Sequence, residues 1–119
     1  KQVNDTYGHL EGDALLIAVA DTLRTSVRSY DIVGRIGGDE FVVYLSNVTD
    51  RQNAMAVAEK LCQVIRGLST MKKEWSNISA SIGISFADHP DIKMEELYIS
   101  ADKAMYSAKG NGRDQYQTL

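Results

Sequence analysis

The sequence is poor in cysteine, has no long apolar run and has no excess of basic residues, and each of these features excludes a class of protein. Its 119 residues include one cysteine, Cys62, so no disulfide can form within the chain, and a reducing cytoplasm fits. No apolar run approaches the roughly 20 residues of a membrane-spanning helix, and no segment has the form of a signal peptide. We therefore expect a cytoplasmic domain, and a membrane anchor elsewhere in a longer parent protein stays open. Basic residues are not in excess, because the formal net charge is -3, so nucleic acid is not an expected partner.

The composition that remains is that of an ordinary globular domain. Hydrophobic residues make up 44% of the chain and charged residues 24%. A chain of this length can bury one continuous core, and we treat residues 1–119 as one domain. The sequence opens in mid-pattern, without an initiator methionine or a strand before the first helix, so we expect a piece of a longer protein.

Periodicity predicts alternating helices and strands. Apolar residues recur at helical spacing after Gly12-Asp13, over 51–67 and over 94–109. Alternation over 78–86 predicts a strand with one buried face, and the tail from Gln115 predicts a last edge strand. With a hairpin between the first two helices, this order predicts an α/β domain whose helices pack on a mixed sheet.

The most informative stretch is Arg-Ile-Gly-Gly-Asp-Glu-Phe at 35–41. Its flanks, 31–36 and 41–45, are rich in β-branched and aromatic residues, and Gly37-Gly38 between them predicts a tight hairpin turn. Asp39 and Glu40 are poor strand formers at the rim of that turn. Two carboxylates beside an open glycine backbone could hold Mg²⁺ and admit a phosphate. The alternative is a solvated hairpin tip with ordinary surface acids.

A second cluster lies near the start of the chain, where Asn4 precedes Asp13. A carboxylate can accept from both donors on the edge of guanine, and an amide can donate to its carbonyl, so this pair suits guanine and not adenine. The alternative is structural: Asp13 as the N-cap of the first long helix and Asn4-Asp5 as turn residues. His9 has no nearby histidine or cysteine, so we expect packing or a loop hydrogen bond for it.

Two further clusters carry cations. Lys109 and Arg113 flank the glycines that end the last helix, where they could either complement the helix dipole or reach the oxygens of a triphosphate. Arg28 and Asp31 lie just before the hairpin. They are either a solvated helix end or a pair that grips a phosphate and a base edge.

Taken together, these motifs resemble the GGDEF domains, which are diguanylate cyclases. The resemblance covers the whole chain. It is carried by Lys-Gln-Val-Asn-Asp-Thr-Tyr-Gly-His at 1–9 with Gly12-Asp13, by 35–41, by Ser-Ile-Gly-Ile at 81–84, by Ala-Asp-Lys-Ala-Met-Tyr-Ser-Ala-Lys at 101–109, and by Gly112-Arg113. It implies an α/β fold with a central mixed, mainly antiparallel sheet and flanking helices, similar to a nucleotidyl cyclase palm.

The resemblance also implies an activity: condensation of two GTP into cyclic di-GMP with release of two pyrophosphates, in a homodimer that uses Mg²⁺ or Mn²⁺. It assigns a role to each matching residue. Asp39 and Glu40 match the catalytic acids that hold the metal, and Gly37 and Gly38 match the open backbone beside them. Asn4 and Asp13 match the residues that read guanine, and Lys1, Lys109 and Arg113 match the cations that bind phosphate. Arg28 and Asp31 match a product-inhibition site for cyclic di-GMP.

One departure from the family concerns the start of the chain. The family places a central strand with a metal-binding aspartate directly before the segment that begins at Lys1, and this sequence lacks it. We expect the parent protein to supply that strand and the fragment alone to be neither stable nor active. Two alternatives to a cyclase stay open: a non-catalytic module that senses GTP or cyclic di-GMP, regulating an attached domain such as an EAL phosphodiesterase, and a purely structural dimerisation domain.

Overall fold

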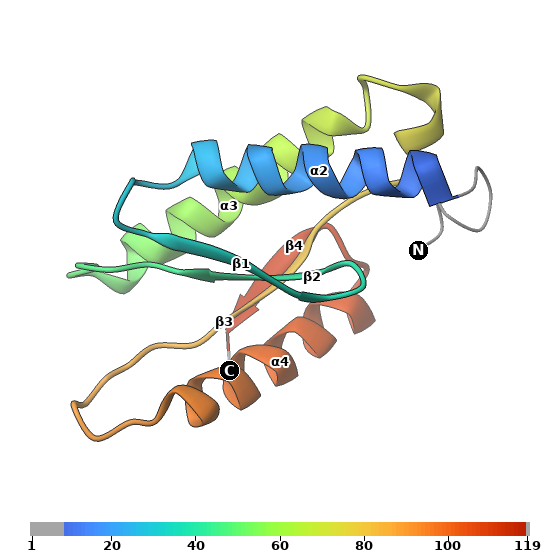
Figure 1. Ribbon diagram of the computed structural model, residues 1–119. Helices are drawn as coiled ribbons and strands as arrows, with labels where there is room; N and C mark the ends of the chain where they lie inside the picture. Colours follow the sequence, from blue (N-terminus) through green and yellow to red (C-terminus); the bar gives the residue numbers. More distant parts are fainter. Residues whose placement is uncertain (1–8, 119) are drawn as a thin grey trace. The chain divides into compact units, whose positions relative to one another are not determined.

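The computed structural model describes residues 9–118, shown as a ribbon in Figure 1. Three α-helices, one short 3₁₀-helix and four strands lie within this range. In chain order they are α2 (His9–Ser26), β1 (Ile32–Gly37), β2 (Glu40–Tyr44), α3 (Arg51–Leu68), η1 (Lys73–Trp75), β3 (Ser81–Ile84), α4 (Met94–Gly110) and β4 (Gln115–Thr118). No helix in this part of the chain is both long and apolar enough to cross a membrane.

The described chain forms two compact units, each with its own small sheet. The first unit holds the chain up to Val48 together with Val64–Ile78, and the second holds Thr49–Gln63 together with the chain from Ser79. Helix α3 contributes to both. The expectation of a single domain over 1–119 stays a prediction.

In the first unit, α2 packs against an antiparallel hairpin of β1 and β2. Ile32 pairs with Tyr44 and Arg35 with Phe41, and a bulge at Ile36 precedes the pairing of Gly37 with Glu40. Bulges bend and twist a hairpin and re-aim the side chains at its tip. The buried apolar residues of this unit come from α2, from the end of α3 and from η1: Leu15, Leu23, Ile65, Leu68 and Trp75.

The segment after α3 is tied to the first turn of α2 through Lys72. Its Nζ lies 3.0 Å from a carboxylate oxygen of Glu11 and 5.0 Å from the ring centroid of Trp75. The Trp75 side chain is 5% exposed. The only tryptophan of the chain is therefore a packed residue.

In the second unit, β3 and β4 form a parallel pair, and α4 packs on both strands. The close approach of α4 to β3 depends on Gly83, because a Cβ there would overlap the backbone of Ala101 and Met105. Ala104 and Ala108 are fully buried on α4. Figure 1 shows the two strands side by side next to this helix.

The predicted fold class is confirmed, with three differences in detail. Helix α2 begins at His9 and runs through Gly12-Asp13 instead of starting after them. Strand β3 is shorter than 78–86, because its partner β4 pairs with only four residues. The described strands form two two-stranded sheets rather than the one sheet that we expected; the upstream central strand stays a prediction.

Candidate functional site

The hairpin tip has the open backbone that the sequence predicted. Gly38 and Asp39 are the two turn residues, and Gly38 has a φ of 51°, the left-handed region that glycine reaches without strain. A Cβ built at Gly37 or Gly38 would meet no atom within 4 Å. The glycine pair is therefore uncrowded on the side where a Cβ would lie, and a phosphate group has room to approach it there.

Arg35 stabilises this turn from inside the hairpin. Its Nε donates a hydrogen bond to the carbonyl oxygen of Gly38 at 2.9 Å. The guanidinium therefore fixes the peptide that leads directly to Asp39. Sequence reasoning did not single out this residue, although its place two positions before the glycine pair was visible.

Asp39 and Glu40 occupy the last turn position and the first position of β2. The Asp39 side chain is exposed and Glu40 is half-buried. Carboxylate oxygens are hard ligands suited to Mg²⁺, which commonly uses one or two carboxylates and completes its shell with water and substrate phosphate. Among the residues that the structure describes, no group of three acidic, histidine or cysteine side chains could hold a metal. By the chemistry of their oxygen donors, Asp39 and Glu40 match the one or two carboxylates that a magnesium site uses.

Asp13 lies in the second turn of α2, with its side chain exposed. The structural alternative for this residue is wrong: an N-cap precedes the first turn, and the helix already begins at His9. Its carboxylate is accordingly not used as the cap of this helix. Asn4 and Lys1, its predicted companions, lie outside the described residues, as does the side chain of His9.

Lys109 and Arg113 belong to the second unit, at the end of α4. Both side chains are exposed. The left-handed residues after the helix are Gly112, Arg113 and Asp114, with φ values of 111°, 63° and 48°. The amide side chain of Gln115 donates to the carbonyls of Asn111 and Arg113, at 2.9 and 3.1 Å. The chain thus leaves helical geometry at glycines, as expected, but the backbone of Arg113 is itself in the left-handed region.

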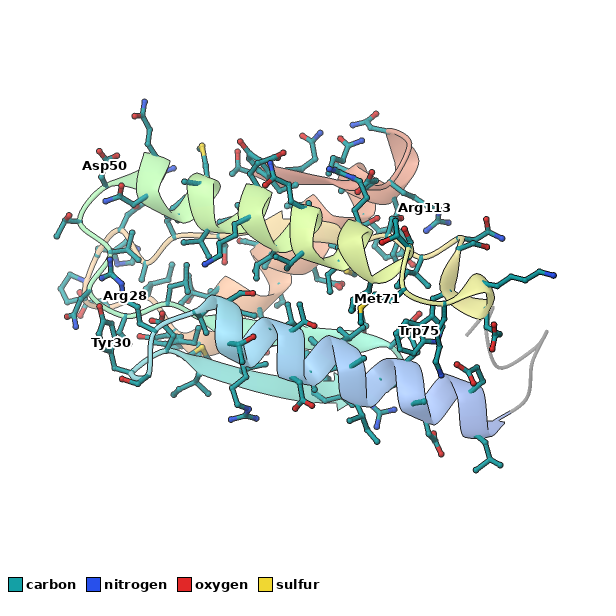
Figure 2. All side chains as sticks on the ribbon, turned by 90° about the horizontal axis from the view of Figure 1, so that it is seen from above. Arg28, Tyr30, Asp50, Met71, Trp75 and Arg113 are labelled. Atoms are coloured by element: carbon teal, nitrogen blue, oxygen red, sulfur yellow. The ribbon has the colours of Figure 1, made fainter. Side chains whose placement is uncertain are left out.

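Arg28 and Asp31 close a turn between α2 and β1. The Asp31 amide donates to the Arg28 carbonyl and the Arg28 amide donates to Asp31 Oδ2, both at 3.0 Å. Figure 2 labels Arg28 and Tyr30 in this turn, and Arg28 Nη1 donates to the Tyr30 hydroxyl at 2.5 Å. That hydrogen bond, followed by the charge interactions with Tyr30 and Asp31, raises the pKa of the Arg28 guanidinium.

The predicted site residues therefore divide between the units. The first unit contains the hairpin residues, Asp13 and the Arg28–Asp31 turn, and the second contains Lys109 and Arg113. Two residues that sequence reasoning did not single out also fix these segments, Arg35 and Tyr30. Each acts through a hydrogen bond to the backbone or side chain of a neighbour, which a sequence motif does not show.

Comparison with known proteins identifies the family. The model of the diguanylate cyclase GGDEF domain matches residues 1–115. The bifunctional diguanylate cyclase/cyclic di-GMP phosphodiesterase MucR of Pseudomonas aeruginosa is 45% identical over 116 residues, which are 98% of this chain and 17% of MucR. Diguanylate cyclase A of Treponema denticola is 40% identical over 97% of this chain and 31% of its own length.

Solved structures agree with the sequence comparison. An EAL/GGDEF domain protein from M. capsulatus matches with a TM-score of 0.77 and 39% identity, over 98% of this chain and 75% of that one. The chain therefore belongs to the GGDEF diguanylate cyclase domain family. It spans less than a third of the length of the two curated relatives named above.

Proposed function

We propose that this chain is the catalytic domain of a diguanylate cyclase, which condenses two GTP into cyclic di-GMP and releases two pyrophosphates. The observation that carries the proposal is the hairpin tip: a glycine pair with open space at its Cβ positions, followed by two carboxylates, in a chain of this family. The nucleotides supply the reacting groups, so the protein has to align them and neutralise charge.

Each proposed role uses chemistry that its side chain offers. Asp13, with Asn4, reads the guanine edge, and Gly37 and Gly38 let the nucleotide approach the hairpin. Lys1, Lys109 and Arg113 neutralise phosphate oxygens. Asp13 and the two cations of the second unit are all exposed, so none of them has to be uncovered before it can bind a nucleotide.

Asp39 and Glu40 are the residues that would hold Mg²⁺ or Mn²⁺. When bound, the ion lowers the pKa of the attacking 3′-hydroxyl and stabilises charge on the α-phosphate. Arg35 keeps the carbonyl before Asp39 in place, so the carboxylates are presented on a fixed turn. The hydroxyl of one nucleotide attacks the α-phosphate of the other, and we propose that two protomers bring the nucleotides together as a homodimer.

We further propose product inhibition through Arg28 and Asp31, with cyclic di-GMP as the ligand. Guanidinium groups bind phosphates and the acceptor edge of guanine, whereas a carboxylate accepts from its donor edge. The turn between these residues is closed by two reciprocal hydrogen bonds. The side chains of Arg28 and Asp31 are therefore both attached to one turn whose backbone is fixed.

A second candidate is a non-catalytic module that senses GTP or cyclic di-GMP and regulates an attached domain. The name of MucR joins a diguanylate cyclase with a cyclic di-GMP phosphodiesterase, and this chain covers 17% of MucR, so an attached domain that such a module could regulate is a reasonable proposal. In that case an EAL phosphodiesterase or a sensor domain in the parent protein would be the regulated partner. The same hairpin would bind a nucleotide without turning it over.

The test uses the protein that contains this chain at its natural full length, incubated with GTP and Mg²⁺. Chromatography with mass detection measures cyclic di-GMP. We expect the D39N/E40Q variant to lose product by at least about a hundredfold, whereas E95Q/E96Q, which changes an acid pair in the first turn of α4, keeps it. If the wild type binds nucleotide but forms no product, the sensor is the correct function.

A further inference from the structure

The turn from Arg28 to Asp31 is anchored to the catalytic hairpin as well as closed on itself. The Ser46 amide, just after β2, donates to Asp31 Oδ1 at 2.9 Å, and the Ser46 hydroxyl lies 3.4 Å from the Tyr30 carbonyl. Asp31 thus accepts one backbone N–H on each carboxylate oxygen. The backbone of this turn has little freedom left.

The Arg28 side chain is also held, which is unusual for an exposed arginine. Its Nη1 donates to the Tyr30 hydroxyl at 2.5 Å, and its Cζ lies 5.9 Å from the centroid of the Tyr30 ring. Tyr30 is itself 45% exposed. An exposed arginine has several rotamers and loses that freedom when it grips a ligand, so holding it beforehand reduces the cost of binding.

The contact leaves the arginine able to bind. A guanidinium carries five N–H donors, of which Tyr30 uses one. The carboxylate oxygens of Asp31 likewise keep lone pairs beyond their two backbone bonds. A ligand with phosphate and guanine edges can still be recognised by both groups.

We propose that Tyr30 is a positioning residue of the inhibitory site, whose hydroxyl holds the Arg28 guanidinium in the orientation that binds cyclic di-GMP. This inference rests on the proposed inhibitory role of Arg28 and Asp31. Tyr30, which lies between Arg28 and Asp31 in the sequence, then helps to set the affinity for cyclic di-GMP without being part of the catalytic hairpin.

The test measures cyclic di-GMP binding to the full-length protein by titration calorimetry, which requires no turnover. Y30F removes the hydroxyl and keeps the ring, and it should weaken binding about three- to tenfold, the usual range for one lost hydrogen bond. R28A should weaken binding by at least about thirtyfold. Y98F is the matched control, because Tyr98 is 42% exposed and lies in the second unit; its binding should equal that of the wild type.

A merely structural role for Tyr30 would give a different pattern. It would lower the melting temperature of Y30F and change the KM for GTP together with the inhibition constant. Positioning instead raises the inhibition constant for cyclic di-GMP and leaves KM and melting temperature unchanged. Y30F binding within twofold of the wild type, with R28A weakened, overturns the inference alone. If the wild-type protein binds no cyclic di-GMP, or if R28A binds it normally, then the proposed inhibitory site is wrong and this inference is wrong with it. The proposal of cyclase activity is tested by the separate assay of product formation and is not affected.

Discussion

Gly83 lies in β3 where α4 crosses closest to the strand, and it offers the sharpest test of the packing. A Cβ at this position would overlap the carbonyl oxygen of Ala101 and the amide nitrogen of Met105, and would lie 3.0 Å from the carbonyl carbon of Ala101. All three atoms are backbone, so no change of side-chain rotamer can relieve the overlap. In G83A the helix itself has to move away from the strand.

The size of the effect follows from that geometry. Overpacking by one methyl group costs roughly 1–3 kcal/mol in proteins, and a clash with rigid backbone belongs near the upper end. We expect G83A to lower the stability of α4 by about 3 kcal/mol. Since each 1.4 kcal/mol is a factor of ten, this corresponds to roughly a hundredfold faster exchange of α4 amides that open with the helix.

Hydrogen–deuterium exchange with mass detection measures this locally in the full-length protein. The control is G67A, because Gly67 is the next-to-last residue of α3 and a Cβ there would meet nothing within 4 Å. Alanine favours a helix interior over glycine by about 1 kcal/mol and has a smaller effect in a last turn, so exchange at this end of α3 should stay the same or slow slightly. G83A should therefore accelerate exchange, whereas G67A should not. Exchange of α4 in G83A within about threefold of the wild type would refute the close contact between α4 and β3.

Two further substitutions test contacts that the sequence did not reveal. R35Q should reduce cyclic di-GMP production about tenfold with little change in melting temperature, because it removes the hydrogen bond that holds the turn before Asp39 and Glu40. R24Q, at the exposed end of α2, is the control. Equal turnover in both variants would contradict the role of Arg35. K72M should cost about 1 kcal/mol of unfolding free energy by removing the Glu11 ion pair and the contact with Trp75. Urea unfolding followed by Trp75 fluorescence checks this, and an unchanged midpoint would show that the contact contributes nothing.

The hairpin could be predicted because all its determinants are local. β-branched flanks, a glycine pair and a two-residue turn lie within one short stretch, and β1 and β2 begin and end close to the predicted positions. The helix start differs from the prediction, because the helical pattern was expected to follow Gly12-Asp13 and α2 begins at His9. In the structure Gly12 is buried inside α2, a place where a glycine is tolerated despite its lower helix propensity.

Strand lengths and sheet composition were harder, because they depend on partners far along the chain. The alternation over 78–86 describes which side chains face inward, but only Ser81–Ile84 find a ladder partner in β4. That pairing is parallel, so it joins segments separated by the whole of α4. No pattern within either strand reports where the other will stop.

The backbone conformation of the loop after α4 was also only partly predictable from the sequence. The sequence indicated that glycines release Lys109 and Arg113 from the helix, and Gly112 has a positive φ as required. A left-handed Arg113 runs against propensity, since its Cβ crowds the following carbonyl. It persists because the Arg113 amide donates to the Ala108 carbonyl at 2.9 Å and Gln115 holds the carbonyls of Asn111 and Arg113. A left-handed residue other than glycine persists where its surroundings fix it, and here the fixing hydrogen bonds come from the end of α4 and from Gln115, so the residue type at position 113 did not indicate this conformation.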